Sequence, residues 1–149
     1  MSLDVVALAG QLIGCRSVTP ADDGAMALLA GTLSDLGFSA QRVDCGPEGN
    51  RTPNLFARKG DKGPHLCFAG HTDVVPPGEG WAHDPFGAHC IDGNLYGRGI
   101  ADMKGGIAAF VAAVASLQTE RPLKGSVSLL ITGDEEGPAL YGTKEVLPG

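Results

Sequence analysis

The fold of this chain is decided by a short apolar run that ends in glycine and polar side chains, Leu66-Cys67-Phe68-Ala69-Gly70-His71-Thr72-Asp73. Four apolar residues between Pro64 and Gly70 are typical of a strand buried on both faces. Residues 127–132 form a second apolar run, which Gly133 closes. Between the two runs, residues 106–117 are apolar almost all round, which predicts a helix packed deeply against a sheet. The alternation of helices with buried strands favours an α/β domain.

The residues before this run predict two helices and two short strands. Apolar side chains between positions 3 and 13 recur at helical spacing and indicate a first helix. A second helix is predicted over 23–36, because Asp22 or Asp23 can accept its first N–H groups and Gly37 suits the left-handed position after its end. The predicted strands are residues 38–43 and 54–58.

Length, composition and charge fit one folded domain. The chain has 149 residues, of which 43% are hydrophobic and 19% are charged, so it can bury a core and does not resemble a disordered chain. Its net charge is −6 and its 11 Lys and Arg residues are scattered, which argues against a nucleic-acid partner. No run reaches the roughly 18 apolar residues of a membrane span, so no membrane partner is expected.

The cysteines and the N-terminal residues indicate a cytoplasmic protein. No two of the four cysteines form a C-x-x-C pair, which favours free thiols in a reducing compartment. The segment Leu12-Ile13-Gly14-Cys15 resembles a lipoprotein signal, but it is preceded by Asp4 and by no basic residue. We therefore interpret it as part of the first helix.

Side chains that bind metals or transfer protons follow the apolar strands directly. His71 and Asp73 follow the first strand, and Glu135 and Glu136 follow the second. A third cluster, which contains Asp102, opens the apolar helix. In open α/β sheets, functional groups collect beyond the carboxyl ends of the strands. The three clusters are therefore expected to meet.

Each of these groups has a chemical and a purely structural interpretation. The His71 imidazole is a zinc ligand whose other N–H is received by Asp73, or the pair is a hydrogen-bonded loop. Asp102 is a ligand that its flanking glycines make accessible, or it is a helix cap. One of Glu135 and Glu136 can bind a metal while the other holds a water, or both are merely solvated. No role is expected for the remaining histidines, His65, His83 and His89.

At these residues the chain resembles the zinc aminoacylase and carboxypeptidase family of co-catalytic, M20-type metallohydrolases. The resemblance covers nearly the whole chain, and its metal motifs are specific. It is carried by residues 16–20, 54–58, 68–78, 81–86, 97–106 and 131–137. It implies a three-layer α/β catalytic domain like that of zinc exopeptidases, with a central mixed, largely parallel sheet flanked by helices.

The resemblance also implies roles for the candidate residues. His71 would bind one zinc ion, Asp102 would bridge two and Glu136 would bind the second, with cobalt as a substitute metal. Glu135 would be the general base and Asp73 the partner of His71, and a cis peptide bond would follow Asp102. The implied activity is zinc-dependent hydrolysis of the amide of an N-succinyl amino acid. A deacylase for another N-acyl group and a non-catalytic metal-binding module are the alternatives.

The same resemblance gives an expectation for how much of the site this chain contains. Residues 1–149 would be the N-terminal part of the catalytic domain, without its later part and without a dimerisation domain. The later part would supply a further carboxylate and a late histidine, and the full-length enzyme would be a homodimer. A catalytic zinc usually has three protein ligands, whereas each zinc would have two here. We therefore expect weak zinc binding and little or no activity from the chain alone.

Overall fold

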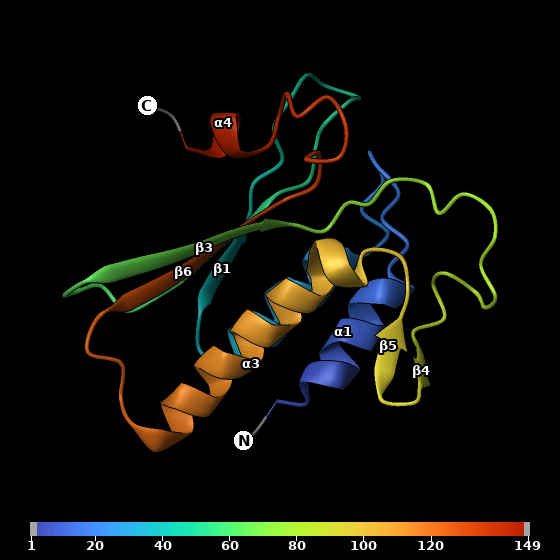
Figure 1. Cartoon of the computed structure of the whole chain (residues 1–149). Helices are drawn as coiled ribbons and strands as arrows, with labels where there is room; N and C mark the ends of the chain where they lie inside the picture. Colours follow the sequence, from blue (N-terminus) through green and yellow to red (C-terminus); the bar gives the residue numbers. More distant parts are fainter. Residues whose placement is uncertain (1–2, 148–149) are drawn as a thin grey trace.

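The computed structural model describes residues 3–147, which form one main sheet, a small hairpin and the helices around them (Figure 1). The helices are α1 (Val5–Gly14), α2 (Ala25–Asp35), α3 (Gly105–Glu120) and α4 (Thr143–Val146), and a kinked turn, η1 (Ile100–Lys104), precedes α3. The strands are β1 (Ser39–Arg42), β2 (Leu55–Lys59), β3 (His65–His71), β4 (His89–Ile91), β5 (Asn94–Tyr96) and β6 (Ser126–Thr132).

The main sheet has the strand order β1-β2-β6-β3. β1 pairs with β2 and β2 pairs with β6 in antiparallel fashion, whereas β3 and β6 are parallel. In the parallel pair, Leu66 is opposite Val127 and His71 is opposite Thr132. The two strands therefore end at the same edge of the sheet, and the segments that follow them start side by side. β4 and β5 form a separate antiparallel hairpin.

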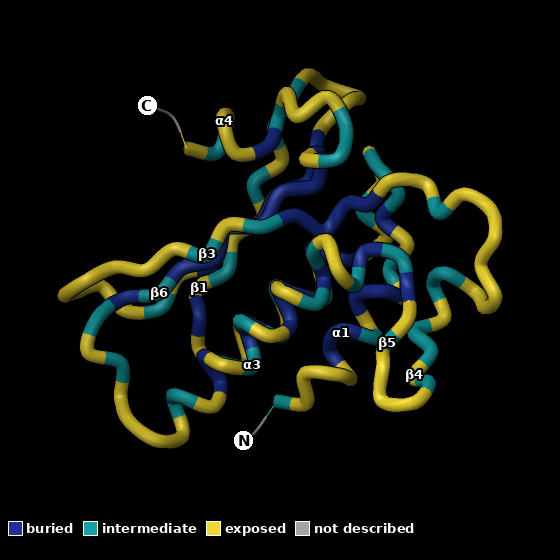
Figure 2. Tube along the Cα trace, viewed as in Figure 1, coloured by how far each residue is buried: buried dark blue, intermediate teal, exposed yellow. Residues whose placement is uncertain are grey.

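The hydrophobic core lies between one face of this sheet and helices α1, α2 and α3 (Figures 1 and 2). β2 contributes Leu55 and Ala57, and β6 contributes Leu129 and Ile131, all without exposed surface. The helices contribute Leu8, Leu12, Met26, Leu29, Leu33, Ile107, Ala108 and Val111. The segment Ile100–Glu120 is long and apolar enough to cross a membrane by length and composition alone, but its helix packs into this core.

The predicted α/β class with a mixed sheet is confirmed, with two corrections. The sheet is partly rather than largely parallel, because β3 and β6 form the only parallel pair among the described strands. β3 is not buried on both faces, since Leu66 is 59% exposed. In the described sheet β3 is an edge strand, whereas β6 lies between β2 and β3 and is buried as predicted. Of the predicted third layer, residues 3–147 contain the short α4 on the face opposite α1 and α3 (Figure 1).

The predicted helices are confirmed, with shifts at their ends. α1 begins after Asp4, whose carboxylate accepts two N–H groups of the first turn at 2.9 and 3.1 Å. α2 begins at Ala25, later than predicted, because Gly24 before it has a left-handed backbone (φ 88°). Gly37 has the predicted left-handed conformation (φ 80°).

Candidate metal centre

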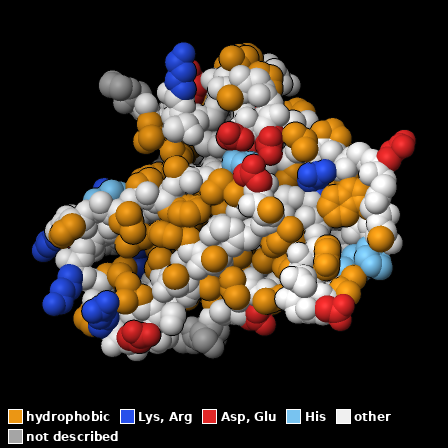
Figure 3. All heavy atoms as spheres, in the orientation of Figure 1, with side chains coloured by type: hydrophobic (Ala, Val, Ile, Leu, Met, Phe, Trp, Pro, Cys, Tyr) orange, Lys and Arg blue, Asp and Glu red, His pale blue; other side chains and the backbone are white. Residues whose placement is uncertain are grey.

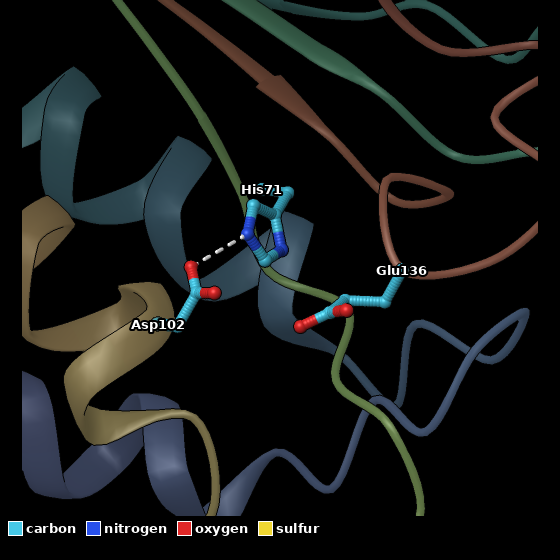
Figure 4. Close-up of side chains that lie close together, drawn as sticks. All are labelled: His71, Asp102 and Glu136. Carbon is cyan, nitrogen blue, oxygen red and sulfur yellow. Dashed lines mark hydrogen bonds and ion pairs between the residues drawn. The ribbon is translucent and has the colours of Figure 1, made fainter.

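Three segments that are far apart in the sequence meet beyond the carboxyl end of the parallel strand pair. β3 ends at His71, the turn after β6 holds Glu135 and Glu136, and η1 carries Asp102. One ligand atom from each of His71, Asp102 and Glu136 lies within 4.8 Å of the other two. Figure 4 shows the three side chains converging, and Figure 3 shows acidic side chains around a histidine ring at the surface. The structure thus brings the three predicted metal ligands together.

His71 presents one ring nitrogen to the backbone and the other to carboxylates. Nδ1 lies 3.0 Å from the carbonyl oxygen of Asp73, and because a carbonyl only accepts, Nδ1 carries the proton. In the neutral ring, Nε2 then holds a lone pair, which lies 3.1 Å from Asp102 Oδ1 and 3.6 Å from Glu135 Oε2. Acceptors that face one another at these distances repel unless a cation lies among them.

Either a proton or a metal ion can be that cation. Without a metal, the Asp73 carboxylate, whose Oδ1 lies 3.5 Å from Nδ1, raises the pKa of His71 to about 9 against the opposing effect of burial. The proton then sits on Nε2 and is donated to Asp102. Neutral imidazole and carboxylate oxygens are zinc ligands, so a divalent metal ion would replace this proton. The donor set therefore fits a metal ion in both chemistry and charge.

Asp73 has contacts that its spacing from His71 did not predict. The ring of His71 makes its shorter contact with the carbonyl of Asp73, whereas the carboxylate accepts N–H groups from Glu135 (3.1 Å) and Glu136 (2.9 Å). Burial acts to raise the pKa of Asp73, but His71 and these two N–H groups hold it below its ordinary value. Asp73 thus fixes the backbone of both glutamates as well as the ring of His71.

Asp102 is not a helix cap. α3 begins at Gly105 without a side-chain cap hydrogen bond, and the backbone of Asp102 is extended (φ −139°, ψ 97°). A cis peptide bond joins Asp102 to Met103, as the family resemblance implied. The Asp102 side chain is 75% exposed and turns toward His71 (Figure 4). The structural interpretation of this residue is therefore wrong.

Lys104 is a buried charge beside the site that the sequence did not reveal. Its side chain has no exposed surface, and Nζ donates to the carbonyl of Cys15 at 2.6 Å. Burial lowers the pKa of Lys104 to about 8, while Cys15, Asp23 and Asp73 act in the opposite direction. Because lysine is rarely buried, the residue type alone did not predict that this side chain would be buried. Its position two residues after Asp102 was the only available hint.

The remaining histidines lie outside this group. The His65 ring contacts the hydroxyl groups of Ser126 and Ser128 on β6, at 2.7 and 3.0 Å. The rings of His83 and His89 lie 5.0 Å apart. Among residues 3–147, the group of side chains able to hold a metal ion includes none of these histidines.

A sequence match to a known family covers the segment that holds all of the candidate residues. The model of peptidase family M20/M25/M40 matches residues 67–149, which is more than half of the chain. This chain belongs to peptidase family M20/M25/M40. The family uses divalent metal ions, in agreement with the donor set formed by His71, Asp102 and Glu136.

Relatives in this family match along almost the whole chain. A succinyl-diaminopimelate desuccinylase of Gluconobacter oxydans is 67% identical over 144 residues, and one of Rhodospirillum centenum is 59% identical over 151 residues. The two matches cover 97% and 99% of this chain but only 38% and 39% of the relatives. The chain therefore spans less than half of the length of the relatives that it matches.

Solved structures agree with the affiliation. Human carnosine dipeptidase 1 superposes with a TM-score of 0.84 and 30% identity, over 95% of this chain and 34% of that protein. An M20 family metallo-carboxypeptidase from Sulfolobus solfataricus superposes with a TM-score of 0.75 and 26% identity, over 90% of this chain and 32% of that protein. The fold is thus that of the M20 catalytic domain.

Proposed function

We propose that this chain carries the metal-binding and proton-transfer residues of an amide hydrolase. Its proposed substrate is N-succinyl-LL-2,6-diaminopimelate, and its products are succinate and LL-2,6-diaminopimelate. The observation that carries the proposal is the convergence of one imidazole and two carboxylates, each from a different segment, beyond the parallel strand pair. The substrate is supported by the names of five relatives that are 56–67% identical to this chain.

Three residues are the proposed metal ligands. His71 would hold one zinc ion, Glu136 would hold a second, and Asp102 would contribute a ligand to both. The Nδ1–H of His71 is engaged by the Asp73 carbonyl, which leaves Nε2 free as a ligand. Cobalt accepts the same donors and can substitute for zinc. Bound zinc supplies polarisation of the amide carbonyl and a lower pKa for the attacking water.

Glu135 is the proposed general base. Its side chain is 59% exposed, and Oε2 lies 3.6 Å from His71 Nε2, next to the proposed ligands. The carboxylate takes a proton from the attacking water as the C–O bond forms, and passes it to the amine nitrogen as the C–N bond breaks. Asp73 receives the N–H groups of Glu135 and Glu136, so one buried carboxylate positions both the base and a ligand.

The chain supplies part of the proposed site. Each zinc ion has two proposed protein ligands here, one fewer than a catalytic zinc usually has. We propose that the missing ligands, most of the substrate pocket and a homodimer interface lie in the part of the relatives that this chain does not match. The 149 residues alone then bind zinc weakly and have little or no activity. We also propose a cytoplasmic location, which is consistent with the four unpaired cysteines. The same proposal includes no nucleic-acid or membrane partner.

The test uses the full-length enzyme and the variant Glu135→Gln. We expect hydrolysis of N-succinyl-LL-2,6-diaminopimelate, and a loss of about 10²–10⁴-fold in kcat for Glu135→Gln with unchanged zinc content. Glu145→Gln changes another exposed glutamate, on α4, and should leave kcat unchanged. Faster hydrolysis of N-acetylornithine would instead indicate acetylornithine deacetylase or a related N-acyl deacylase. Zinc binding without hydrolysis of either substrate would indicate a non-catalytic module.

A further inference from the structure

Arg98 links the loop that follows His71 and Asp73 to the segment of Asp102. We propose that Arg98 is a positioning residue of the metal centre, because it clamps these two segments together. The importance of the clamp for metal binding rests on the roles proposed above for His71 and Asp102.

The clamp consists of contacts that converge on the carbonyl of Pro77. Arg98 Nη2 donates to this oxygen at 3.0 Å, and Trp81 Nε1 donates to the same oxygen at 2.8 Å. The guanidinium carbon of Arg98 lies over the Trp81 ring, 5.4 Å from its centre. The backbone N–H of Arg98 donates to the carbonyl of Pro85 at 2.7 Å. Arg98 therefore holds the loop at two places, before and after Trp81.

Both sides of the clamp lead to residues of the proposed site through short stretches of chain. Pro76 and Pro77 have fixed φ angles, so few free torsions separate the Pro77 carbonyl from Asp73. On the other side, Gly99 approaches Val74 so closely that a Cβ on this glycine would lie 2.5 Å from Val74 Cγ1. A shift of the loop would therefore move Asp73 and Val74 relative to the segment that leads to Asp102.

Arginine is suited to this place for a chemical reason. Its planar guanidinium donates at its edge to Pro77 while its face stacks on Trp81, whereas a lysine ammonium is a point charge that cannot do both. Within residues 3–147, no carboxylate lies within ion-pair distance of Arg98, so its charge has no salt-bridge role there. Arg16 provides a control, because it also stacks on an aromatic ring, Phe86, at 4.7 Å. Among residues 3–147, the side-chain donors to the Pro77 carbonyl are Trp81 and Arg98, not Arg16.

The experiment compares Arg98→Lys with Arg16→Lys in the 149-residue chain. Trp81 is the only tryptophan of the sequence, so quenching of its fluorescence by acrylamide reports on the loop without any metal. We expect Arg98→Lys to increase this quenching and to raise the Kd for cobalt, followed by its absorption spectrum, about tenfold. Arg16→Lys should change neither quantity. Unchanged quenching, or increased quenching with an unchanged cobalt Kd, would overturn the proposal.

A second variant and a metal-free measurement keep the test decisive. Trp81→Phe keeps a smaller aromatic ring under Arg98 and removes one donor to Pro77, so it should raise the cobalt Kd less than Arg98→Lys does. Because the ligand set of this chain is incomplete, the unaltered chain can bind cobalt too weakly for a titration. The clamp is then judged by amide exchange of Val74, whose N–H donates to the carbonyl of Ser17 at 3.0 Å. Arg98→Lys should accelerate this exchange, and an unchanged rate overturns the clamp.

Discussion

The candidate metal centre has a buried half and an exposed half. His71, Asp73 and Lys104 have 5%, 1% and 0% of their surface exposed. The side chains of Asp102 and Glu135 are 75% and 59% exposed. Backbone carbonyl and N–H groups hold the buried half, whereas the exposed carboxylates depend on few protein contacts. Folding therefore fixes the first half, and we expect a bound cation to add most of the contacts that hold the second. Substitutions in the buried half should therefore lower the free energy of unfolding, whereas substitutions of the exposed carboxylates should mainly weaken metal binding.

The largest loss of stability is expected when the buried half loses its carboxylate. Asp73→Asn should lower the free energy of unfolding by about 3 kcal/mol, because His71 loses its anionic partner and one glutamate N–H faces an amide N–H. Urea unfolding measures the change. Asp35→Asn, which alters an exposed carboxylate at the end of α2, should stay within about 0.5 kcal/mol. Equal stability of the two variants would mean that the buried half does not depend on Asp73.

The next largest effect is expected where the segment of Asp102 approaches Val74. Gly99 and Gly78 both have left-handed backbones, with φ of 83° and 72°. Replacement by alanine should cost about 1 kcal/mol at either position from backbone strain. Gly99→Ala should cost roughly 1–2 kcal/mol more, because its Cβ would meet Val74, whereas nothing lies within 4 Å of Gly78. Equal losses in urea unfolding would argue against a tight contact at Gly99.

A smaller effect concerns pH, since the two bases of the buried half act in opposite directions. The pKa of His71 is raised from 6.5 to about 9, so the folded state binds more protons and stability falls as pH rises through this window. The pKa of Lys104 is lowered from 10.5 to about 8, so the folded state binds fewer protons and stability rises between these values.

Lys104→Met isolates the second of these contributions. The free energy of unfolding of the unaltered chain, minus that of the variant, should increase as pH rises from about 8 to 10.5. Urea unfolding across this range gives the difference. A difference that falls with pH would contradict the assignment of a buried, charged Lys104.

The smallest change in stability is expected for the carboxylates of Asp102, which is exposed, and Glu136, which is partly buried. Asp102→Asn and Glu136→Gln should alter the free energy of unfolding by no more than about 0.5 kcal/mol, because neither carboxylate holds the fold. Both should nevertheless raise the Kd for cobalt, which a titration of the same samples measures. A large loss of stability in either variant would remove the distinction between the two halves.

The features that could be predicted from the sequence are those that depend on the residues of a single segment. β6 carries apolar side chains on nearly all sides and is buried along almost its whole length. α3 is equally apolar, but only one of its faces is buried. The proposed metal ligands could be predicted because His71 and Glu136 follow apolar strands and Asp102 precedes an apolar helix. Their motifs also match a known family.

The features that could not be predicted depend on contacts between distant segments. β3 has an apolar run like that of β6, but its burial depends on what pairs with its outer edge. Asp73 accepts N–H groups from residues 62 and 63 positions away. Lys104 is buried because the carbonyl of Cys15, 89 positions away, receives its ammonium group. Local spacing contains no information about such pairings.

The candidate metal centre can form only when β3 and β6 pair in the correct register. His71 is opposite Thr132, and side chains alternate between the two faces of a strand. A slip of one residue would turn His71 to the other face and away from Glu136. Metal ions held by these two residues and by Asp102 would therefore stabilise the correct alignment over the slipped ones. A misaligned chain would lose its ability to hold the metal before it lost its sheet.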